Sequence, residues 1–293
     1  MVFLSYLISG IGLGSVYAII ALGYSMVYGI AKMLNFAHGD VIMIGAYVAF
    51  FALNRFNMPA ILAVFMSVVV CTLLGVIIEK LAYKPLRNAS SLAVLITAIG
   101  VSYFLQNFAQ LIWTSSPKFF TSIVGNESFS LFDGKLNISY INVLTIVSCI
   151  VIMIVLTLFI NNTKTGRAMR ACSEDKDAAR LMGINVNRTI SITFAIGSGL
   201  AAIASVLLCS TYPSVSPTLG SMPGIKAFTA AVFGGIGSIP GAFVGGLLLG
   251  IIENLSKAYI STQLSDAIVF AVLIIVLLIK PAGILGKKVN EKV

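Results

Sequence analysis

The stretch Asn161–Asn187, NNTKTGRAMRACSEDKDAARLMGINVN, is a long polar run between two strongly apolar segments of this 293-residue chain. The apolar segments on either side are long enough to cross a bilayer, and the stretch itself carries both basic and acidic side chains. It therefore marks a place where the chain leaves the membrane, and we expect residues 161–189 to form a cytoplasmic loop.

Within this loop the residue order predicts a short helix from Glu174 to Met182. Ser173 is a suitable N-cap, the acidic residues after it favour the positive end of the helix dipole, and Gly183 can adopt the left-handed conformation that ends a helix. Three residues at helical spacing form a small apolar patch on which a partner protein could dock: Ala178, Ala179 and Met182. The alternative is a solvated connector whose charges only fix the topology.

Composition places the whole chain in a membrane. Hydrophobic residues make up 58% of it, charged residues only 10%, and the mean hydropathy is +1.02. A soluble domain has roughly 25% charged residues. Backbone groups cannot stay unpaired in lipid, so the apolar runs must be helices. Spans are expected at 2–30, 59–81, 91–113, 141–160 and 190–211, with shorter or broken segments at 39–53, 226–255 and 266–279.

The expected fold is therefore all-α: a single polytopic transmembrane helical bundle over residues 1–293. We expect eight to nine membrane segments, some of them short or broken, and a short cytoplasmic helix in the polar loop. The four cysteines lie in apolar spans or in the cytoplasmic loop and are interpreted as packing residues.

The charge distribution predicts the orientation. Fourteen of the 19 Lys and Arg fall in loops that share one side if the N-terminus is external and the C-terminus cytoplasmic. The polar stretch 114–140 is then an external loop. The formal net charge of +9 does not indicate nucleic-acid binding, because the basic residues cluster in loops rather than along a soluble face.

Two interruptions of the apolar pattern attract attention, at residues 33–40 and 233–241. The run Val41–Leu53 after the first interruption would rise only ~20 Å as a helix, so it starts inside the membrane or tilts. Asp40 is the only carboxylate in the first 78 residues and His38 is the only histidine. These groups either face the substrate path or are charges at the cytoplasmic interface, and both alternatives stay open.

Paired helix breaks are typical of transporters with a site at mid-membrane, and we place these residues on a translocation path: Asn35, His38, Gly39, Asp40, Gly234 and Gly235.

The sequence offers no convergent set of acid, base, nucleophile or metal-binding residues. One histidine and scattered carboxylates do not make a catalytic centre, and the second glycine-rich break lacks the GxxxxGK[ST] pattern of a nucleotide-binding loop. We predict that the chain is not an enzyme and holds neither a cofactor nor a metal. An ion-coupled secondary transporter remains an alternative, with Asp40 and Glu253 as the plausible coupling carboxylates.

Several blocks resemble one family. Asp177-Ala178-Ala179 followed by Gly183 resembles the Glu-Ala-Ala-x-x-x-Gly loop of ABC importer permeases. Asp stands in place of Glu, and the Ile-x-Leu-Pro that often ends that loop is absent, with Ile190-Ser191-Ile192-Thr193 nearby. The segment 166–171 resembles the form found in permeases for branched-chain amino acids. Further blocks similar to that family lie at 24–29, 35–40, 79–87, 99–107, 226–242 and 280–286.

The resemblance implies a permease subunit of a binding-protein-dependent ABC importer in the bacterial inner membrane. The implied partners are a second permease in a heterodimer, two cytoplasmic ATP-binding subunits, and a periplasmic or extracellular substrate-binding protein. The implied ATPase-coupling residues are Gly166, Arg167, Arg170, Asp177, Ala178, Ala179 and Gly183. Leucine, isoleucine and valine are the implied substrates, and a permease for another amino acid or a small amide such as urea is the alternative.

Overall fold

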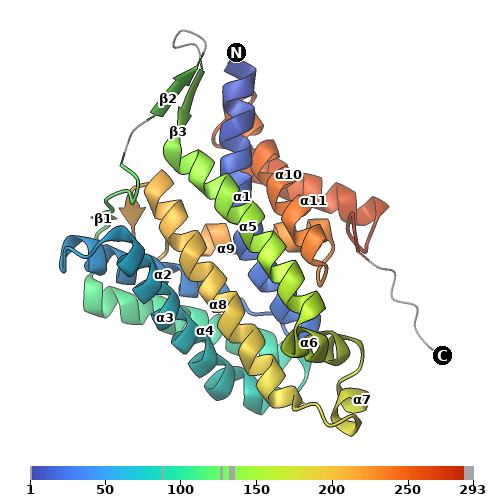
Figure 1. Cartoon of the computed structure of the whole chain (residues 1–293). Coiled ribbons are helices and arrows are strands. Elements are labelled where there is room, and N and C mark those ends of the chain that lie inside the picture. The colour runs from blue at the N-terminus through green and yellow to red at the C-terminus, as the bar shows by residue number, and fades with distance from the viewer. Residues whose placement is uncertain (1, 88, 126–127, 132–135, 287–293) are drawn as a thin grey trace.

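A computed structural model of the chain describes residues 2–87, 89–125, 128–131 and 136–286. Within these residues helices carry nearly all of the regular structure (Figure 1). The α-helices are α1 Val2–Ala31, α2 His38–Asn54, α3 Ala60–Ile78, α4 Ser91–Trp113, α5 Tyr140–Asn162, α6 Lys164–Glu174, α7 Lys176–Leu181, α8 Val186–Thr211, α9 Ser221–Gly234, α10 Ile239–Tyr259 and α11 Ser265–Ile279. A π-helical turn, Glu79–Tyr83, and a 3-10 turn, Lys84–Leu86, continue α3.

Among the described residues, six helical segments are long and apolar enough to cross a membrane, which confirms the expected helical membrane fold. They are Val2–Ala31, Ala60–Leu86, Ser91–Trp113, Tyr140–Asn162, Val186–Thr211 and Ile239–Tyr259. The apolar helices α2 and α11 are shorter, and α9 has 14 residues. The number of crossings depends on these three helices, so the count of eight to nine stays a prediction.

The first helix, α1, runs through the centre of the bundle, and nearly all of its residues from Gly12 to Ala31 are buried. It packs antiparallel to α10 because small residues on both helices let the backbones meet. A Cβ at Gly14 would lie 2.8 Å from the Leu247 Cα, so this contact requires glycine. The other mainly buried helix is α8, which packs against α1, α2 and α3.

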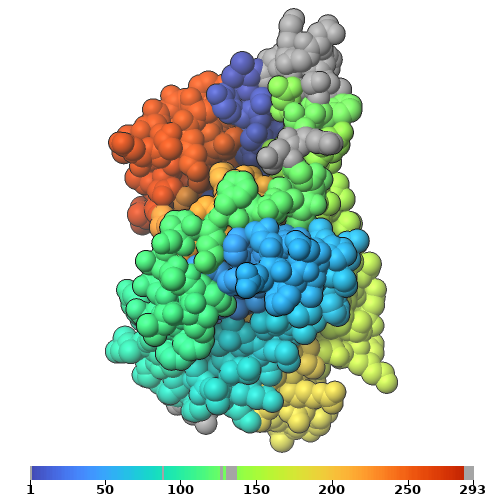
Figure 2. Space-filling model, turned by 90° about the vertical axis from the view of Figure 1, so that its left-hand side faces the viewer, coloured from blue at the N-terminus to red at the C-terminus, as the bar shows by residue number. Residues whose placement is uncertain are grey.

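The outer helices α3, α4 and α5 expose apolar side chains along most of their length. Figure 2 shows the face of the molecule on which α3 and α4 lie. On α4 the exposed apolar residues are Leu92, Ile96, Ile99, Tyr103, Phe104, Phe108, Leu111 and Ile112. Large exposed apolar area on a helical bundle indicates a surface that meets lipid or a partner helix rather than water.

Both predicted helix breaks are present, and local backbone conformation explains them. In the first break, between α1 and α2, Lys32 has a positive φ of 56°. In the second, between α9 and α10, Gly235 and Gly237 have φ of 111° and 89°, which glycine adopts without strain. Ser238 then caps α10 by accepting a hydrogen bond from the Gly241 amide.

In the part of the chain that the structure describes, four short strands lie outside the long helices, a detail that the all-α prediction missed. The strands β2 Ser128–Leu131 and β3 Leu136–Ser139 pair antiparallel within the 114–140 loop. The strands β1 Lys118–Phe119 and β4 Ser214–Val215 pair antiparallel and join that loop to the turn after α8. The β2–β3 pair and the α6–α7 segment lie at opposite ends of the molecule (Figure 1).

Candidate functional site

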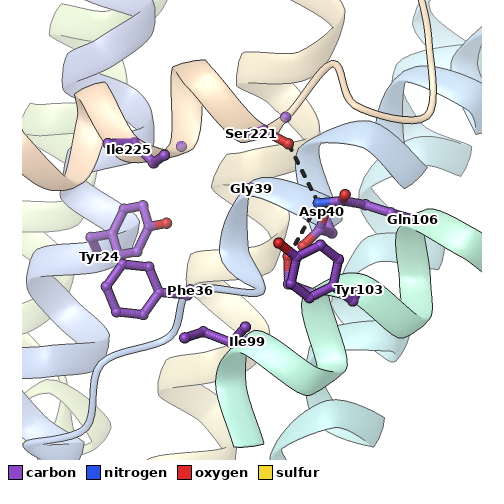
Figure 3. Close-up of a pocket in the computed structure, with 12 residues that line it drawn as sticks. Tyr24, Phe36, Gly39, Asp40, Ile99, Tyr103, Gln106, Ser221 and Ile225 are labelled. Atoms are coloured by element: carbon purple, nitrogen blue, oxygen red, sulfur yellow. Dashed lines mark hydrogen bonds between the residues drawn. The ribbon is translucent and has the colours of Figure 1, made fainter. Parts of the chain in front are cut away.

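A cavity of about 230 Å³ lies where the first helix break meets α4 and the start of α9 (Figure 3). The lower part of α1, the 32–37 segment, the first turn of α2, one face of α4 and the first turn of α9 all contribute to its walls. Its lining residues are Tyr24, Phe36, Gly39, Asp40, Ile99, Ser102, Tyr103, Gln106, Gly220, Ser221, Gly224 and Ile225. Polar groups gather around Asp40, and the remaining wall is largely apolar.

The helix α2 begins inside the bundle and not at its edge. A Cβ at Gly23 would lie 2.8 Å from His38 Nε2, so the start of α2 is level with Gly23 of α1. Gly23 lies eight residues before the end of α1 at Ala31, a rise of ~12 Å at 1.5 Å per residue. The segment 32–37 therefore turns back into the bundle, and this places Asp40 beside the cavity.

The starts of α2 and α9 meet backbone to backbone. A Cβ at Gly39 would lie 2.5 Å from the Gly220 carbonyl oxygen, and a Cβ at Gly224 would lie 3.0 Å from the Gly39 Cα. Two helices can approach this closely only where side chains are absent. The glycines thus hold the first turns of two interrupted helices together at one side of the cavity.

Asp40 is buried and hydrogen bonded by a neutral amide. Gln106 Nε2 donates to Asp40 Oδ1 at 2.9 Å, and it lies 3.2 Å from Ser102 Oγ and 3.4 Å from Ser221 Oγ (Figure 3). These groups come from α2, α4 and α9. Gln106 therefore bridges α4 to α2 through the carboxylate of Asp40.

The other residues predicted for the translocation path lie around the cavity or away from it. His38 is buried, its ring packs edge-on to Tyr24 at 4.6 Å between centroids, and its Nε2 has no hydrogen-bond partner in the described structure. Asn35 Oδ1 accepts a 2.8 Å hydrogen bond from Tyr83, which anchors the 32–37 segment. Neither side chain lines the cavity.

Gly234 and Gly235 lie at the far end of α9. They pack against the start of α10 and against residues 285–286, and the Leu285 amide donates to the Gly234 carbonyl. The structure thus separates the two predicted groups by the length of α9. Sequence reasoning did not select Ser102 or Ser221, because a serine in an apolar helix gives no local signal of its partners.

The predicted coupling loop contains two helices and not one. Thr163 caps α6, which continues through Ser173 to Glu174, so Ser173 is not an N-cap. Asp175 Oδ1 caps α7 by accepting from the amides of Asp177 and Ala178 at 2.8 and 3.0 Å. Gly183 has the predicted left-handed conformation, with a φ of 80°.

The exposed face of α7 differs from the predicted patch. Ala179 is buried in the core and does not belong to it. Ala178 and Asp177 are exposed, and Leu181 and Met182 are among the most exposed apolar residues, at 90% and 82%. An apolar pair at the tip of a polar segment is a surface suited to a protein partner.

The residues of α6 that were predicted to couple to the ATPase differ in exposure. Gly166 is buried against the backbone at the end of α5. Arg167 is exposed, and Arg170 Nη1 donates to Asn161 Oδ1 at 3.3 Å. The α6 helix thus fixes the direction in which α7 extends from the bundle.

One side chain joins α7 to the segment that leads to the cavity. Lys176 Nζ donates a 2.6 Å hydrogen bond to the Ala31 carbonyl at the end of α1. Burial lowers the pKa of Lys176, and the positive charges of Arg87 and Lys32 lower it further. The contact satisfies a carbonyl that the end of a helix leaves free.

A second buried polar group involves the carboxylate of Glu253. Glu253 accepts hydrogen bonds from Tyr17 at 2.8 Å, Lys226 at 2.8 Å and Lys257 at 2.6 Å. Lys226 also pairs with Asp266 at 2.6 Å. This Glu253 network links α1, α9, α10 and α11, and its formal charges cancel. Among the described residues no group of three or more His, Cys, Asp and Glu is placed to hold a metal ion.

Comparison with known proteins matches residues 6–277 to a family described as the permease component of the branched-chain amino acid transport system. The chain belongs to this permease family. Relatives in the permease family cover the chain almost end to end. The high-affinity branched-chain amino acid transport system permease protein LivH of Escherichia coli K12 is 47% identical over 306 residues, covering 99% of this chain and 98% of the relative.

Two further relatives extend the comparison. The permease protein BraD of Pseudomonas aeruginosa is 47% identical over 303 residues, with the same coverage of both chains. A probable LivH permease protein of Methanocaldococcus jannaschii is 31% identical over 285 residues, covering 92% of this chain and 88% of the relative. The match confirms the family resemblance, and together with the six apolar helices it identifies an integral membrane protein of the branched-chain amino acid permease family.

Proposed function

We propose that this chain is a permease subunit of an ABC importer that moves leucine, isoleucine and valine across the cytoplasmic membrane. The observation that carries the proposal is the similarity, over nearly the whole chain, to relatives named as permeases of high-affinity branched-chain amino acid transport systems. ATP hydrolysis would occur in partner subunits, and the chain itself would catalyse no reaction.

The cavity beside Asp40 is the proposed part of the translocation path in this subunit. Phe36, Ile99 and Ile225 offer apolar wall to an aliphatic side chain, and the polar groups around Asp40 offer hydrogen bonds to a charged backbone group. The starts of the two short helices α2 and α9 form one wall of the cavity, as expected of a transport site built on discontinuous helices. Asn35 and His38 would support the path by positioning its wall.

The α6–α7 segment is the proposed docking site for an ATP-binding subunit. Leu181 and Met182 would enter a groove of the partner, and Asp177 and Arg180, paired at 3.1 Å, would border the contact. Movement of α7 would reach the cavity through Lys176, which is bonded to the end of α1 just before the 32–37 segment. Closure of the ATPases would in this way change access to the cavity.

The proposed assembly contains a second permease subunit, two ATP-binding subunits and an external substrate-binding protein. The N-terminus would be external and the C-terminus cytoplasmic, as the distribution of basic residues favours. In that orientation the loop 114–140 faces the binding protein and α7 faces the ATPases.

Leucine uptake into membrane vesicles tests the proposal. Vesicles holding this chain and its neighbouring subunits are loaded with ATP, or given a proton or sodium gradient, each with and without the binding protein. We expect uptake only when ATP and the binding protein are both present. Uptake driven by an ion gradient alone would show a secondary transporter, and competition by isoleucine, valine and urea measures the substrate range.

A further inference from the structure

The arrangement around Gln106 has the geometry of a cation site occupied by an amide. Three oxygen atoms from three helices surround Gln106 Nε2: Asp40 Oδ1 at 2.9 Å, Ser102 Oγ at 3.2 Å and Ser221 Oγ at 3.4 Å. An amide nitrogen has only two hydrogens to share among them. An ammonium nitrogen has three, so it matches the number of acceptors better than the amide does.

The charge of Asp40 is not balanced within the described part of the chain. Five ion pairs join described residues, and Asp40 takes part in none of them. The residue is only 2% exposed. Burial of a carboxylate without a counter-ion is unfavourable, and a bound cation would relieve it. The other buried carboxylates, Glu79 and Glu253, each have a basic partner.

The cavity next to these oxygens limits the kind of cation. Phe36, Ile99 and Ile225 contribute apolar side chains, and the closely packed backbone at Gly39, Gly220 and Gly224 completes the wall beside Asp40. A bare metal ion would not use the apolar wall. A primary ammonium group attached to a branched aliphatic chain would use both parts of the cavity.

We propose that Asp40, Ser102 and Ser221 form a recognition site for the ammonium group of the substrate, with Gln106 holding the site when no substrate is present. Gln106 swings aside, the ammonium nitrogen takes its position between the three oxygens, and the aliphatic chain lies against Phe36, Ile99 and Ile225. The identification of the substrate as an amino acid rests on the proposed function. The preference for an ammonium group rests on the geometry alone.

Direct binding to the assembled transporter without its binding protein tests the site. Saturation-transfer NMR compares 3-methylbutylamine, which has the ammonium group but no carboxylate, with 4-methylpentanoate, which has the carboxylate but no ammonium group. We expect the amine and leucine to bind, the acid to bind far more weakly, and excess Na⁺ not to displace the amine. Equal binding of amine and acid, or displacement of the amine by Na⁺, would overturn the proposal.

Two substitutions with opposite expected effects separate recognition from structural damage. Asp40→Asn keeps the size of the side chain and removes its charge, and should weaken binding of the amine by about ten- to hundredfold. Its thermal stability without substrate should equal or exceed that of the wild type, because an unbalanced buried charge is gone. Gln106→Ala removes the competing amide and should strengthen binding of the amine.

The matched control is Asn107→Ala, on the neighbouring residue of α4, whose exposed amide bonds only to the Tyr103 carbonyl of its own helix among the described residues. It should bind the amine as the wild type does. Unchanged binding in Asp40→Asn, or weaker binding in Gln106→Ala, would contradict the proposal. These results do not depend on ATP, so a failure of the uptake experiment leaves the ammonium site to be judged by its own test.

Discussion

Gly39 illustrates how one residue determines the shape of the cavity. The Gly39→Ala substitution would place a methyl group 2.5 Å from the Gly220 carbonyl oxygen, which belongs to the backbone and cannot move without displacing the start of α9. Overpacking of this kind costs ~1–3 kcal/mol. We expect a lower unfolding temperature for the purified protein and weaker binding of leucine, measured by thermal unfolding and by NMR.

Gly100 provides the control for that prediction. It lies in α4, and a Cβ at Gly100 meets no described heavy atom within 4 Å. Gly100→Ala should therefore leave the fold intact and stabilise the helix by up to ~1 kcal/mol. Equal unfolding temperatures for the two alanine variants would show that the contact between α2 and α9 does not constrain the cavity.

Single residues also show where sequence reasoning stops. Gly235 and Gly237 follow a local rule, because a positive φ favours glycine wherever it occurs, and the second helix break was predictable from them. Asp40 stood out as a carboxylate in apolar surroundings, and Gln106 is a polar residue of an apolar span. Their contact was not predictable, because 66 residues separate them and only the packing of α2 on α4 brings them together.

At the scale of elements, α6 and α7 show a competition between two adjacent caps. Ser173 and Asp175 both suit the start of a helix, and the sequence alone could not choose between them. The structure uses Asp175, whose extended backbone ends α6 and whose carboxylate reaches two amides of α7. The predicted single helix was thus wrong in its boundaries and right in the position of its glycine end.

The bond between α7 and α1 leads to a prediction about coupling. Lys176→Met keeps an unbranched side chain of similar length but removes the ammonium group that donates to the Ala31 carbonyl. A hydrogen bond from a charged donor contributes ~1.5–3 kcal/mol, so we expect leucine uptake per ATP hydrolysed to fall about tenfold. Lys164→Met, at an exposed lysine at the start of α6, is the control and should keep the wild-type ratio. Equal ratios in both variants would exclude Lys176 as a link.

The tip of α7 leads to a prediction about assembly. Leu181→Ser combined with Met182→Ser should leave this chain stable, because both side chains are largely exposed in it. If they enter a groove of the ATPase, their loss should weaken association by ~2 kcal/mol, about thirtyfold, as measured by co-purification at several concentrations. The control is Phe129→Ser, which removes an exposed apolar group from β2 at the opposite end of the molecule. Unchanged association in the α7 variant would place docking elsewhere.

At the scale of the whole molecule, both helix breaks contact the same central helix, α1. The start of α2 lies against α1 at Gly23, and the Gly237 amide at the start of the α10 segment donates to Ser25 of the same helix at 2.9 Å. Two interrupted segments thus meet α1 within one turn of each other. The sequence predicted both breaks but not that one helix supports both, since that follows from tertiary packing alone. A displacement of α1 would move both breaks together.

The orientation of the molecule in the membrane can be measured by labelling introduced cysteines, because the native cysteines should react little. All four native cysteines are buried and free, so a membrane-impermeant thiol reagent should label the wild type weakly. Ser116→Cys places a thiol in the exposed part of the 114–140 loop, and Arg180→Cys places one on exposed α7.

Because most basic residues lie in loops on the α7 side, we expect intact cells to label at position 116, and to label at position 180 only after permeabilisation. The reverse pattern would invert the topology, and labelling of both positions from outside would mean that an odd number of crossings does not separate the two segments.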